Sequence, residues 1–347
     1  MSNLIIRADA STAIGTGHVM RCLALAQGWQ ESGGGVYFVL ATHNPELEIR
    51  ILNEGMKIIH IDADSGSIED SIQFITILRE TGADWVVVDG YHFGAEYQKR
   101  IKDAGLSLLF IDDYGHADHY YADIILNQNI YAEPSIYKNI EPYTQLLLGT
   151  RYALLRKEFL KFSGWKREIP EVAHKVLVTF GGGDPPNVTL KVIESLKKVR
   201  VDNLEVIIVV GGANPHYSEL IKAIQNFPKF KIINNGADMP NLIAWADLAI
   251  SAGGSTNLEL AFMGLPSITI NHAQNQILNS KVLDQFGLVK NLGWFEKLKQ
   301  KDISSAVEYF MKSKDKRRQM AEKGRILVDG GGSKRVIEWI TGEKNAA

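Results

Sequence analysis

The 347-residue chain has a single cysteine, Cys22, which excludes an intrachain disulfide framework. It has no apolar run long enough to cross a membrane, and its first residues, MSNLIIRADAS, lack the hydrophobic segment of a secretion signal. Neither sign of charge prevails, because 38 basic residues stand against 40 acidic ones. No basic run indicates a nucleic-acid surface. We therefore expect a cytoplasmic protein that binds a small molecule, with no nucleic-acid partner and no membrane insertion.

Several catalytic motifs are also missing. The sequence has no Gly-x-x-x-x-Gly-Lys phosphate loop, no Gly-x-Ser-x-Gly elbow and no zinc-spaced His/Cys cluster, which argues against kinases, esterases and zinc hydrolases. Asp62 and Asp64 form an Asp-x-Asp pair that could hold a divalent metal on a nucleotide sugar. Acids that follow a strand are more often solvated turn residues. We expect neither a metal nor a cofactor.

The length of the chain and its 45% hydrophobic content predict two domains. Short β-branched runs alternate with amphipathic segments, which is typical of buried parallel strands in βαβ units. The sequence therefore predicts an α/β protein with two doubly wound sheets. The predicted strands are LIIRA, VYFVLA, KIIHID, WVVVDG, LLFIDD and DIILNQ, then, after a gap, KVLVTFGG, EVIIVVGG, KIINN, DLAISAGG and SITIN.

The gap between the two sets of strands contains the predicted domain boundary. It ends in a charged, Pro-bounded stretch, KREIPEVAHK, and we place the boundary between Phe162 and Pro170. The predicted domains are residues 1–165 and 166–347. The last stretch, DGGGSKRVIEWITG, indicates a glycine break followed by a helix that could return to the first domain.

Ligands of open α/β sheets bind beyond the carboxyl ends of the strands, so the turns there carry the functional information. The first turn runs from Arg7 to Arg21. It fails the dinucleotide fingerprint, because Met20 stands where the third glycine is needed and no acid closely follows the next strand. Gly15 and Gly17 would instead bring the backbone close to a ligand. His18 at the helix start is then either a neutral base or a capping histidine.

The second turn, ISAGGSTNLELAFMGLP, joins a strand to a helix within one compact βαβ unit. Its small residues would offer backbone N–H groups and hydroxyls to a pyrophosphate at a helix N-terminus. They are Ser251, Ala252, Gly253, Gly254, Ser255 and Thr256. Glu259 stands three residues after Thr256, so it is either a capping-box residue or a ribose ligand, and spacing alone slightly favours the cap.

Three further turns are weaker candidates. NHAQNQ places Asn275 and Gln276 after the next strand, where amides suit sugar hydroxyls and N-acyl groups, although a loop cap is equally consistent. TFGGGDPPN contains Gly182 and fits either a phosphate loop or a plain tight turn. VVVDGYHF places Asp89 and Tyr91 at a strand end in the first domain. Tyr91 then faces a cleft or lies on the surface.

Four segments resemble a known family. RADASTAIGTGHVMRCLALA, LLGTRYALLRKEF, ISAGGSTNLELAFMGLP and NHAQNQ are similar to segments of the UDP-2,4-diacetamido-2,4,6-trideoxy-β-L-altropyranose hydrolases of the pseudaminic acid pathway, which are relatives of MurG-like glycosyltransferases. The first segment is specific to that group, and ISAGGSTNLELAFMGLP is shared more widely. The resemblance implies a GT-B architecture, with two Rossmann-like domains facing across a cleft and the nucleotide held mainly by the second.

The resemblance also implies roles for individual residues. His18 matches the catalytic base, Glu259 the ribose-binding glutamate and Asn275 a substrate-orienting amide. Residues 251–256 match the diphosphate loop, and Tyr91 occupies the place of a cleft tyrosine. Together with Gly15, Gly17, Arg21, Gly182 and Gln276, these residues are the expected contacts of a UDP-sugar.

A single base is chemically sufficient for the implied reaction. UDP is a stable leaving group, so its departure from the sugar carbon C1 needs no general acid, provided that amides and a helix dipole balance the developing charge. Ordinary glycosidases need two carboxylates because their leaving alcohols are poor. We expect a metal-independent hydrolase with His18 as the base. A MurG-like glycosyltransferase and a non-catalytic nucleotide-sugar binder remain alternatives.

Overall fold

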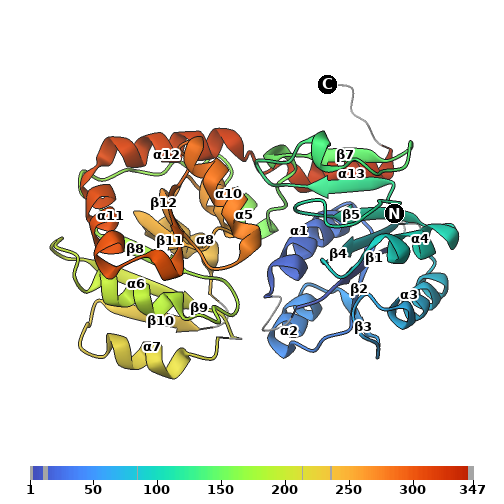
Figure 1. Ribbon diagram of the computed structural model, residues 1–347, viewed down its shortest axis with the longest axis horizontal. Helices are drawn as coiled ribbons and strands as arrows, with labels where there is room; N and C mark the ends of the chain where they lie inside the picture. The colour runs from blue at the N-terminus through green and yellow to red at the C-terminus, as the bar shows by residue number, and fades with distance from the viewer. Residues whose placement is uncertain (1–2, 11–14, 84, 213, 235–236, 343–347) are drawn as a thin grey trace. The chain divides into compact units, whose positions relative to one another are not determined.

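The computed structural model describes residues 3–10, 15–83, 85–212, 214–234 and 237–342 (Figure 1). The chain forms two compact units. The first comprises Met1–Lys157 and Gly330–Ala347, and the second comprises Glu158–Asp329. The chain thus passes to the second unit a few residues before the predicted boundary at 165. The last residues, which the predicted division assigned to the second domain, belong to the first unit.

The first unit is a sandwich of helices around a parallel sheet whose described strands have the order β3-β2-β1-β4-β5-β6-β7. Its strands are β1 (Asn3–Ala8), β2 (Gly35–Leu40), β3 (Lys57–His60), β4 (Trp85–Asp89), β5 (Ser107–Ile111), β6 (Ile124–Asn127) and β7 (Gln145–Leu148). Its helices are α1 (Gly17–Glu31), α2 (Pro45–Asn53), α3 (Ile68–Thr81), α4 (Ala95–Asp103) and α13 (Gly332–Thr341), with 3-10 turns at Pro134–Ile136 and Thr150–Tyr152.

The second unit repeats the plan with described strands in the order β10-β9-β8-β11-β12-β13. Its strands are β8 (Lys175–Thr179), β9 (Glu205–Val210), β10 (Phe230–Asn234), β11 (Leu248–Ser251), β12 (Ser267–Asn271) and β13 (Lys290–Trp294). Its helices are α6 (Val188–Leu196), α7 (Tyr217–Ile224), α8 (Met239–Trp245), α9 (Thr256–Phe262), α10 (Gln274–Gln285), α11 (Gln300–Lys312) and α12 (Lys314–Leu327), with a 3-10 turn at Phe295–Lys297. Short α5 (Lys157–Leu160) lies where the chain leaves the first unit.

Both sheets are covered on two faces, which explains why their strands are continuous apolar runs. In β1, Leu4 and Ile6 pack into the core that contains α1, whereas Ile5 packs into the core that contains Phe74 of α3. Successive side chains of a strand point to opposite faces, so every residue of β1 from Leu4 to Ala8 is buried. Burying one such aliphatic side chain contributes about 1.5–3 kcal/mol to folding.

The strand order confirms the prediction of two doubly wound sheets. In each unit the order reverses between two neighbouring strands, β1 and β4 in the first and β8 and β11 in the second. Such a switch point leaves an open crevice at the carboxyl ends of the strands. Two strands, β7 and β13, were not predicted. The four residues of β7 fall in the segment that was assigned to the interdomain gap. Strand β13 contains Gly293, which interrupts its apolar pattern.

Helix α13 packs on α1, and glycines allow the close approach of its backbone to neighbouring residues. A Cβ atom on Gly28 of α1 would lie 2.8 Å from the Cδ1 atom of Ile337, and one on Gly332 would lie 2.1 Å from the carbonyl oxygen of Ala153. The hydroxyl of Ser333 donates to the carbonyl oxygen of Ala24 at 3.4 Å. The two glycines therefore allow the last helix to complete the core of the first unit.

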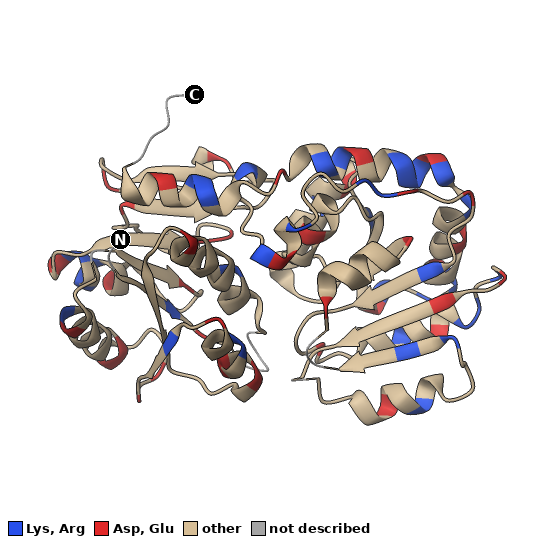
Figure 2. Cartoon of the chain, turned by 180° about the vertical axis from the view of Figure 1, so that it is seen from behind, with Lys and Arg blue, Asp and Glu red and all other residues tan. Residues whose placement is uncertain are grey.

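No helix within the described ranges is both long and apolar enough to cross a bilayer. Along the helices of each unit, Lys and Arg are interspersed with Asp and Glu, as Figure 2 shows from behind. This mixture of signs agrees with the near balance of charge in the sequence.

Candidate active site

The turn after β1 places a histidine at the start of α1. The helix begins at Gly17 and His18 is 8% exposed. Its Nδ1 atom is buried and makes no hydrogen bond to any described residue. Burial lowers the pKa of His18 below its ordinary value of 6.5; Arg21 acts in the same direction, while Asp89 and Asp113 oppose the shift. The side chain is therefore a neutral imidazole at neutral pH.

Three charged side chains form a buried cluster at the first turn of α1. Arg21 donates from Nε and Nη2 to the two carboxylate oxygens of Asp89, at 2.6 and 2.7 Å, and from Nη1 to Asp113 at 2.7 Å. Burial alone would raise the pKa of Asp113, but Arg21 and a hydrogen bond from Tyr91 together hold it below its ordinary value of 3.8. Arg21 was expected to contact the substrate. In the structure its guanidinium binds two carboxylates, and the contact with the substrate stays a prediction.

Tyr91 connects this cluster to His18. Its ring meets the imidazole edge-on, with centroids 4.9 Å apart and planes at 87°, and its hydroxyl donates to Asp113 at 2.6 Å. Asp89 ends β4 and Asp113 follows β5, so the two carboxylates that bind Arg21 come from neighbouring strands of the sheet. Asp113 is also the carboxylate that Tyr91 binds. The sequence singled out the histidine and the tyrosine, but it did not indicate their direct contact or the role of Asp113 in joining Tyr91 to Arg21.

Gly15 and Gly17 of the first turn have open space around them. Gly15 has a φ of +77°, a conformation that favours glycine, and a Cβ at Gly15 or Gly17 would meet no described atom within 4 Å. Residues 11–14 of the same turn lie outside the described residues. At the end of β1, Asp9 bonds Arg7 at 2.7 Å and accepts from the backbone of Ala41 at 2.8 Å, which fixes where the turn starts.

In the second unit, the loop after β11 is held from beneath by polar side chains. Asn257 donates to the carbonyl oxygens of Ala252 and Gly254 at 2.9 and 3.0 Å, and Asn279 of α10 donates to the carbonyl oxygen of Gly253 at 3.0 Å. These short-range and long-range hydrogen bonds fix the backbone of residues 252–254. Asn257 and Asn279 were not predicted, although an asparagine within a small-residue loop is a recognisable signal for such bonds.

The residues of this loop differ in how they can meet a ligand. The hydroxyl of Ser251 is fully buried and donates to Asn257 at 3.2 Å, so Ser251 shapes the loop and offers no exposed hydroxyl. A Cβ on Gly253 would lie 2.1 Å from the Oγ atom of Ser280, whereas one on Gly254 would meet no described atom. Ser255 is the N-cap of α9 and makes no side-chain cap bond, and Thr256 is the first helical residue.

The start of α9 bears on the capping-box interpretation of Glu259. A capping box needs its Ser or Thr at the N-cap and its Glu at the third helical position. Since Ser255 is the N-cap, Thr256 and Glu259 do not have that relation. Glu259 lies one turn into α9 and is half-buried. It remains the candidate ribose ligand.

The two predicted amides after β12, Asn275 and Gln276, have different surroundings. The Oε1 atom of Gln276 accepts from the backbone N–H groups of His272 and Ala273, at 3.0 and 3.3 Å, so Gln276 caps α10. Asn275 is exposed. Of the two predicted contacts, Gln276 has the capping role that the sequence left open.

The glycine-rich turn after β8 is closed by its own carboxylate. Asp184 accepts from the backbone N–H groups of Val188 and Thr189 at 2.9 and 2.8 Å, and from the Thr189 hydroxyl at 2.6 Å. The backbone N–H groups at the start of α6 thus have a partner within the turn itself, which agrees with the interpretation of this segment as a plain tight turn. Gly182 packs closely on Gly211, whose added Cβ would lie 2.4 Å from the Gly182 carbonyl oxygen.

The switch points and loops described above agree with comparisons to known proteins. Residues 176–330 match the glycosyltransferase family 28 C-terminal domain. Over 99% of this chain and 100% of the other, the structure resembles MurG of Acinetobacter baumannii, with a TM-score of 0.69 at 16% identity. The chain has the GT-B fold. This confirms the architecture that the resemblance implied.

Sequence relatives include proteins of polysaccharide biosynthesis and a nucleotide-sugar hydrolase. The chain is 26% identical to the Bacillus subtilis spore coat polysaccharide biosynthesis protein SpsG over 95% of both chains. It is 28% identical to a UDP-2,4-diacetamido-2,4,6-trideoxy-β-L-altropyranose hydrolase of Campylobacter jejuni, over 65% of this chain and 74% of that one. An uncharacterized protein of Methanocaldococcus jannaschii, MJ1062, is 28% identical over 77% of this chain, and the match spans 55% of that protein. The resemblance to the hydrolases is confirmed.

Proposed function

We propose that this chain is a cytoplasmic UDP-sugar hydrolase of the pseudaminic acid pathway. Its substrate is a UDP-linked 2,4-diacetamido-2,4,6-trideoxy sugar, and its products are UDP and the free sugar. The observation that carries the proposal is a buried imidazole, His18, at the start of α1 with its pKa lowered by burial. The relative with the hydrolase name and the family 28 domain support the substrate class.

The reaction needs one proton transfer and one bond exchange. His18 takes a proton from water, the water oxygen forms a bond to C1 of the sugar, and the C1–O bond breaks with its electron pair on the UDP oxygen. Tyr91 and the pair of Arg21 with Asp113 hold the imidazole in place. Backbone amides at the start of α9 balance the charge on the departing diphosphate, so the proposed reaction needs no metal.

The test is UDP release without an acceptor. The full chain is incubated with the UDP-linked diacetamido sugar or with UDP-N-acetylglucosamine, in chelator and in oxygen-18 water. We expect UDP from the first substrate only, unchanged by chelator, with the heavy oxygen on the released sugar. Label on UDP would mean attack at phosphorus. UDP release only after an acceptor is added would favour a glycosyltransferase.

Two neighbouring glycines give a matched test of the nucleotide loop. In Gly254→Ala the new methyl meets no described atom, so the protein should keep its stability. UDP affinity should fall on the order of tenfold or more, because the methyl occupies space next to the proposed diphosphate, and tenfold corresponds to about 1.4 kcal/mol. In Gly253→Ala the clash with Ser280 should lower the free energy of unfolding by about 1–3 kcal/mol.

Calorimetry with UDP and urea denaturation separate these two effects. If Gly254→Ala binds UDP as tightly as the native chain, the diphosphate does not lie on this loop. If Gly253→Ala is as stable as the native chain, Ser280 of α10 can move away from the new methyl without cost.

A further inference from the structure

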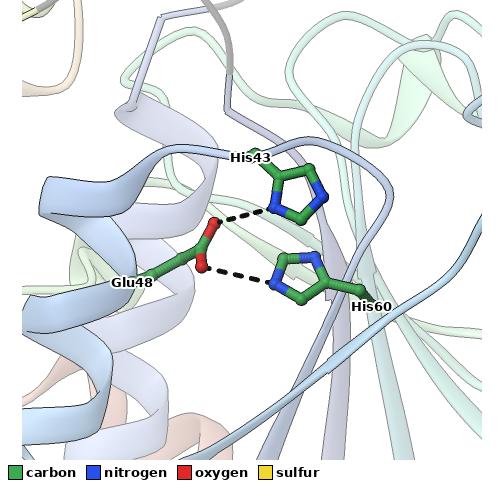
Figure 3. A group of neighbouring side chains, drawn as sticks. All are labelled: His43, Glu48 and His60. Atoms are coloured by element: carbon green, nitrogen blue, oxygen red, sulfur yellow. Dashed lines mark hydrogen bonds and ion pairs between the residues drawn. The ribbon is translucent and has the colours of Figure 1, made fainter.

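Three polar side chains meet on the first unit at the ends of two strands. His43 follows β2, His60 ends β3, and Glu48 lies on α2 between them in sequence. One ligand atom from each lies within 4.8 Å of the others, and within the described ranges this is the one group of three such residues that is close enough to share a metal ion. Figure 3 shows the Nδ1 atom of His43 and the Nε2 atom of His60 both directed at the Glu48 carboxylate.

The spacing of these atoms is compatible with a shared cation. The Nδ1 atom of His43 is 3.6 Å from Oε1 of Glu48, and the Nε2 atom of His60 is 3.3 Å from Oε2. The second of these contacts is a hydrogen bond, although a longer one than those of His116 with Asp112 at 2.6 Å and of His119 with Glu141 at 2.9 Å. Two ligands of a tetrahedral zinc ion, each about 2.1 Å from the metal, are about 3.4 Å apart.

The carboxylate of the group is held in place by its helix. Asn44 is the N-cap of α2, with its side chain accepting from the backbone N–H of Leu47 at 3.2 Å. The backbone N–H of Asn44 in turn donates to Oε1 of Glu48 at 2.9 Å. Hydrogen bonds of this kind orient metal ligands and increase the affinity of metal sites.

The imidazoles leave the group open to solvent. The side chains of His43, His60 and Glu48 are 75%, 34% and 19% exposed, and the two rings stack with centroids 4.2 Å apart. A metal can therefore enter without rearrangement of the core, and a water molecule can complete its coordination. Two imidazoles and one carboxylate favour zinc and similar transition-metal ions over magnesium and calcium, which prefer oxygen ligands.

We propose that His43, Glu48 and His60 form a binding site for a divalent transition-metal ion of the zinc class. The ion links the segment after β2 to the end of β3. This inference is independent of the proposed hydrolase, because none of its three residues takes part in the proposed reaction. In the sequence, Asp62 and Asp64 are the candidate metal ligands, whereas His43, Glu48 and His60 form no recognisable motif because they come from a loop, a helix and a strand.

The test is metal binding by the full chain after treatment with chelator. We expect one equivalent of zinc by calorimetry, one equivalent of cobalt with the absorption of a site that has nitrogen ligands, and no competition by magnesium. His43→Ala and His60→Ala should each weaken zinc binding by about 10–100-fold or more, because loss of a direct ligand costs at least as much as loss of an outer-shell partner. Zinc should raise the melting temperature of the native chain but not of these variants.

His119→Ala is the matched control. His119 has the same side-chain exposure as His60, 34%, and pairs with one carboxylate, but it does not belong to the group. This variant should bind zinc as the native chain does. Equal zinc affinity in His43→Ala, His60→Ala and the native chain would overturn the proposal, as would an equal loss in His119→Ala. The group would then contain only the hydrogen bond between His60 and Glu48, with His43 stacked on His60.

Discussion

Replacement of His18 by Asn should lower the rate of UDP release by about 10²–10⁴-fold and leave UDP affinity nearly unchanged. The rate falls because the amide cannot accept the proton of the attacking water. The affinity is retained because the proposed nucleotide loop, residues 251–256, belongs to the second unit, whereas His18 belongs to the first. Steady-state kinetics with the UDP-linked diacetamido sugar and calorimetry with UDP measure the two quantities on the same protein.

The pH dependence adds a readout that a merely structural role would not give. A base acts in its neutral form, so the rate of the native chain should rise with pH through one ionisation and then level off. Because burial lowers the pKa of His18, this ionisation should lie below 6.5. The same rise should be absent from the residual activity of the Asn variant.

His119→Asn serves as the control for this prediction. His119 is a histidine of the same unit, bonded to Glu141 at 2.9 Å and outside the proposed machinery, so this variant should keep its activity. Near-normal turnover of His18→Asn, or an unchanged pH profile, would remove His18 from the mechanism without affecting the fold.

Replacement of Arg21 by Leu should lower the free energy of unfolding by about 3–5 kcal/mol, because it leaves the buried carboxylates Asp89 and Asp113 without their cation. Arg21→Lys should recover only part of this loss, since an ammonium cannot reproduce the paired bonds to Asp89. Urea denaturation at neutral pH measures both. Lys99→Met removes an exposed pair with Asp103 and should leave the stability nearly unchanged.

Acid should reveal the same interaction. The pKa of Asp113 in the folded chain lies below its ordinary value, so Asp113 stabilises the fold above that value and loses this contribution as the pH falls below about 4. Without Arg21 this part of the acid sensitivity should disappear. If Arg21→Leu is as stable as the native chain at neutral pH, the cluster is not what holds α1 against the sheet.

Local patterns were sufficient for most of the fold. The strands of both sheets are apolar runs because each is covered on two faces, and a run such as that of β1 is visible without any knowledge of its neighbours. Gly15 and Gly254 were identified because a glycine after a strand and before a helix marks a turn. Strand β7 escaped notice because four residues on the border of a sheet carry little pattern.

The side-chain pairs of the site depend on contacts that a sequence does not display. Arg21 meets Asp89 and Asp113 only because α1, β4 and β5 are brought together by the sheet, and 68 and 92 positions separate these residues along the chain. The expectation that Arg21 contacts the substrate rested on the resemblance and on its place in the first turn, neither of which indicates these two carboxylates. The capping role of Gln276 was recognised as an alternative because it depends on neighbours four positions away.

The packing of α13 on α1 also makes the core of the first unit depend on residues that follow the second unit in sequence. Ile337 and Ile340 of α13 belong to the same core as Leu4 of β1, so the first unit gains part of its interior from residues near the end of the chain. The second unit, Glu158–Asp329, has all of its residues before α13 is translated. Domains usually fold on the ribosome from the N-terminus onward. We therefore expect the first unit to complete its core only after α13 has been translated, when all residues of the second unit have already been made.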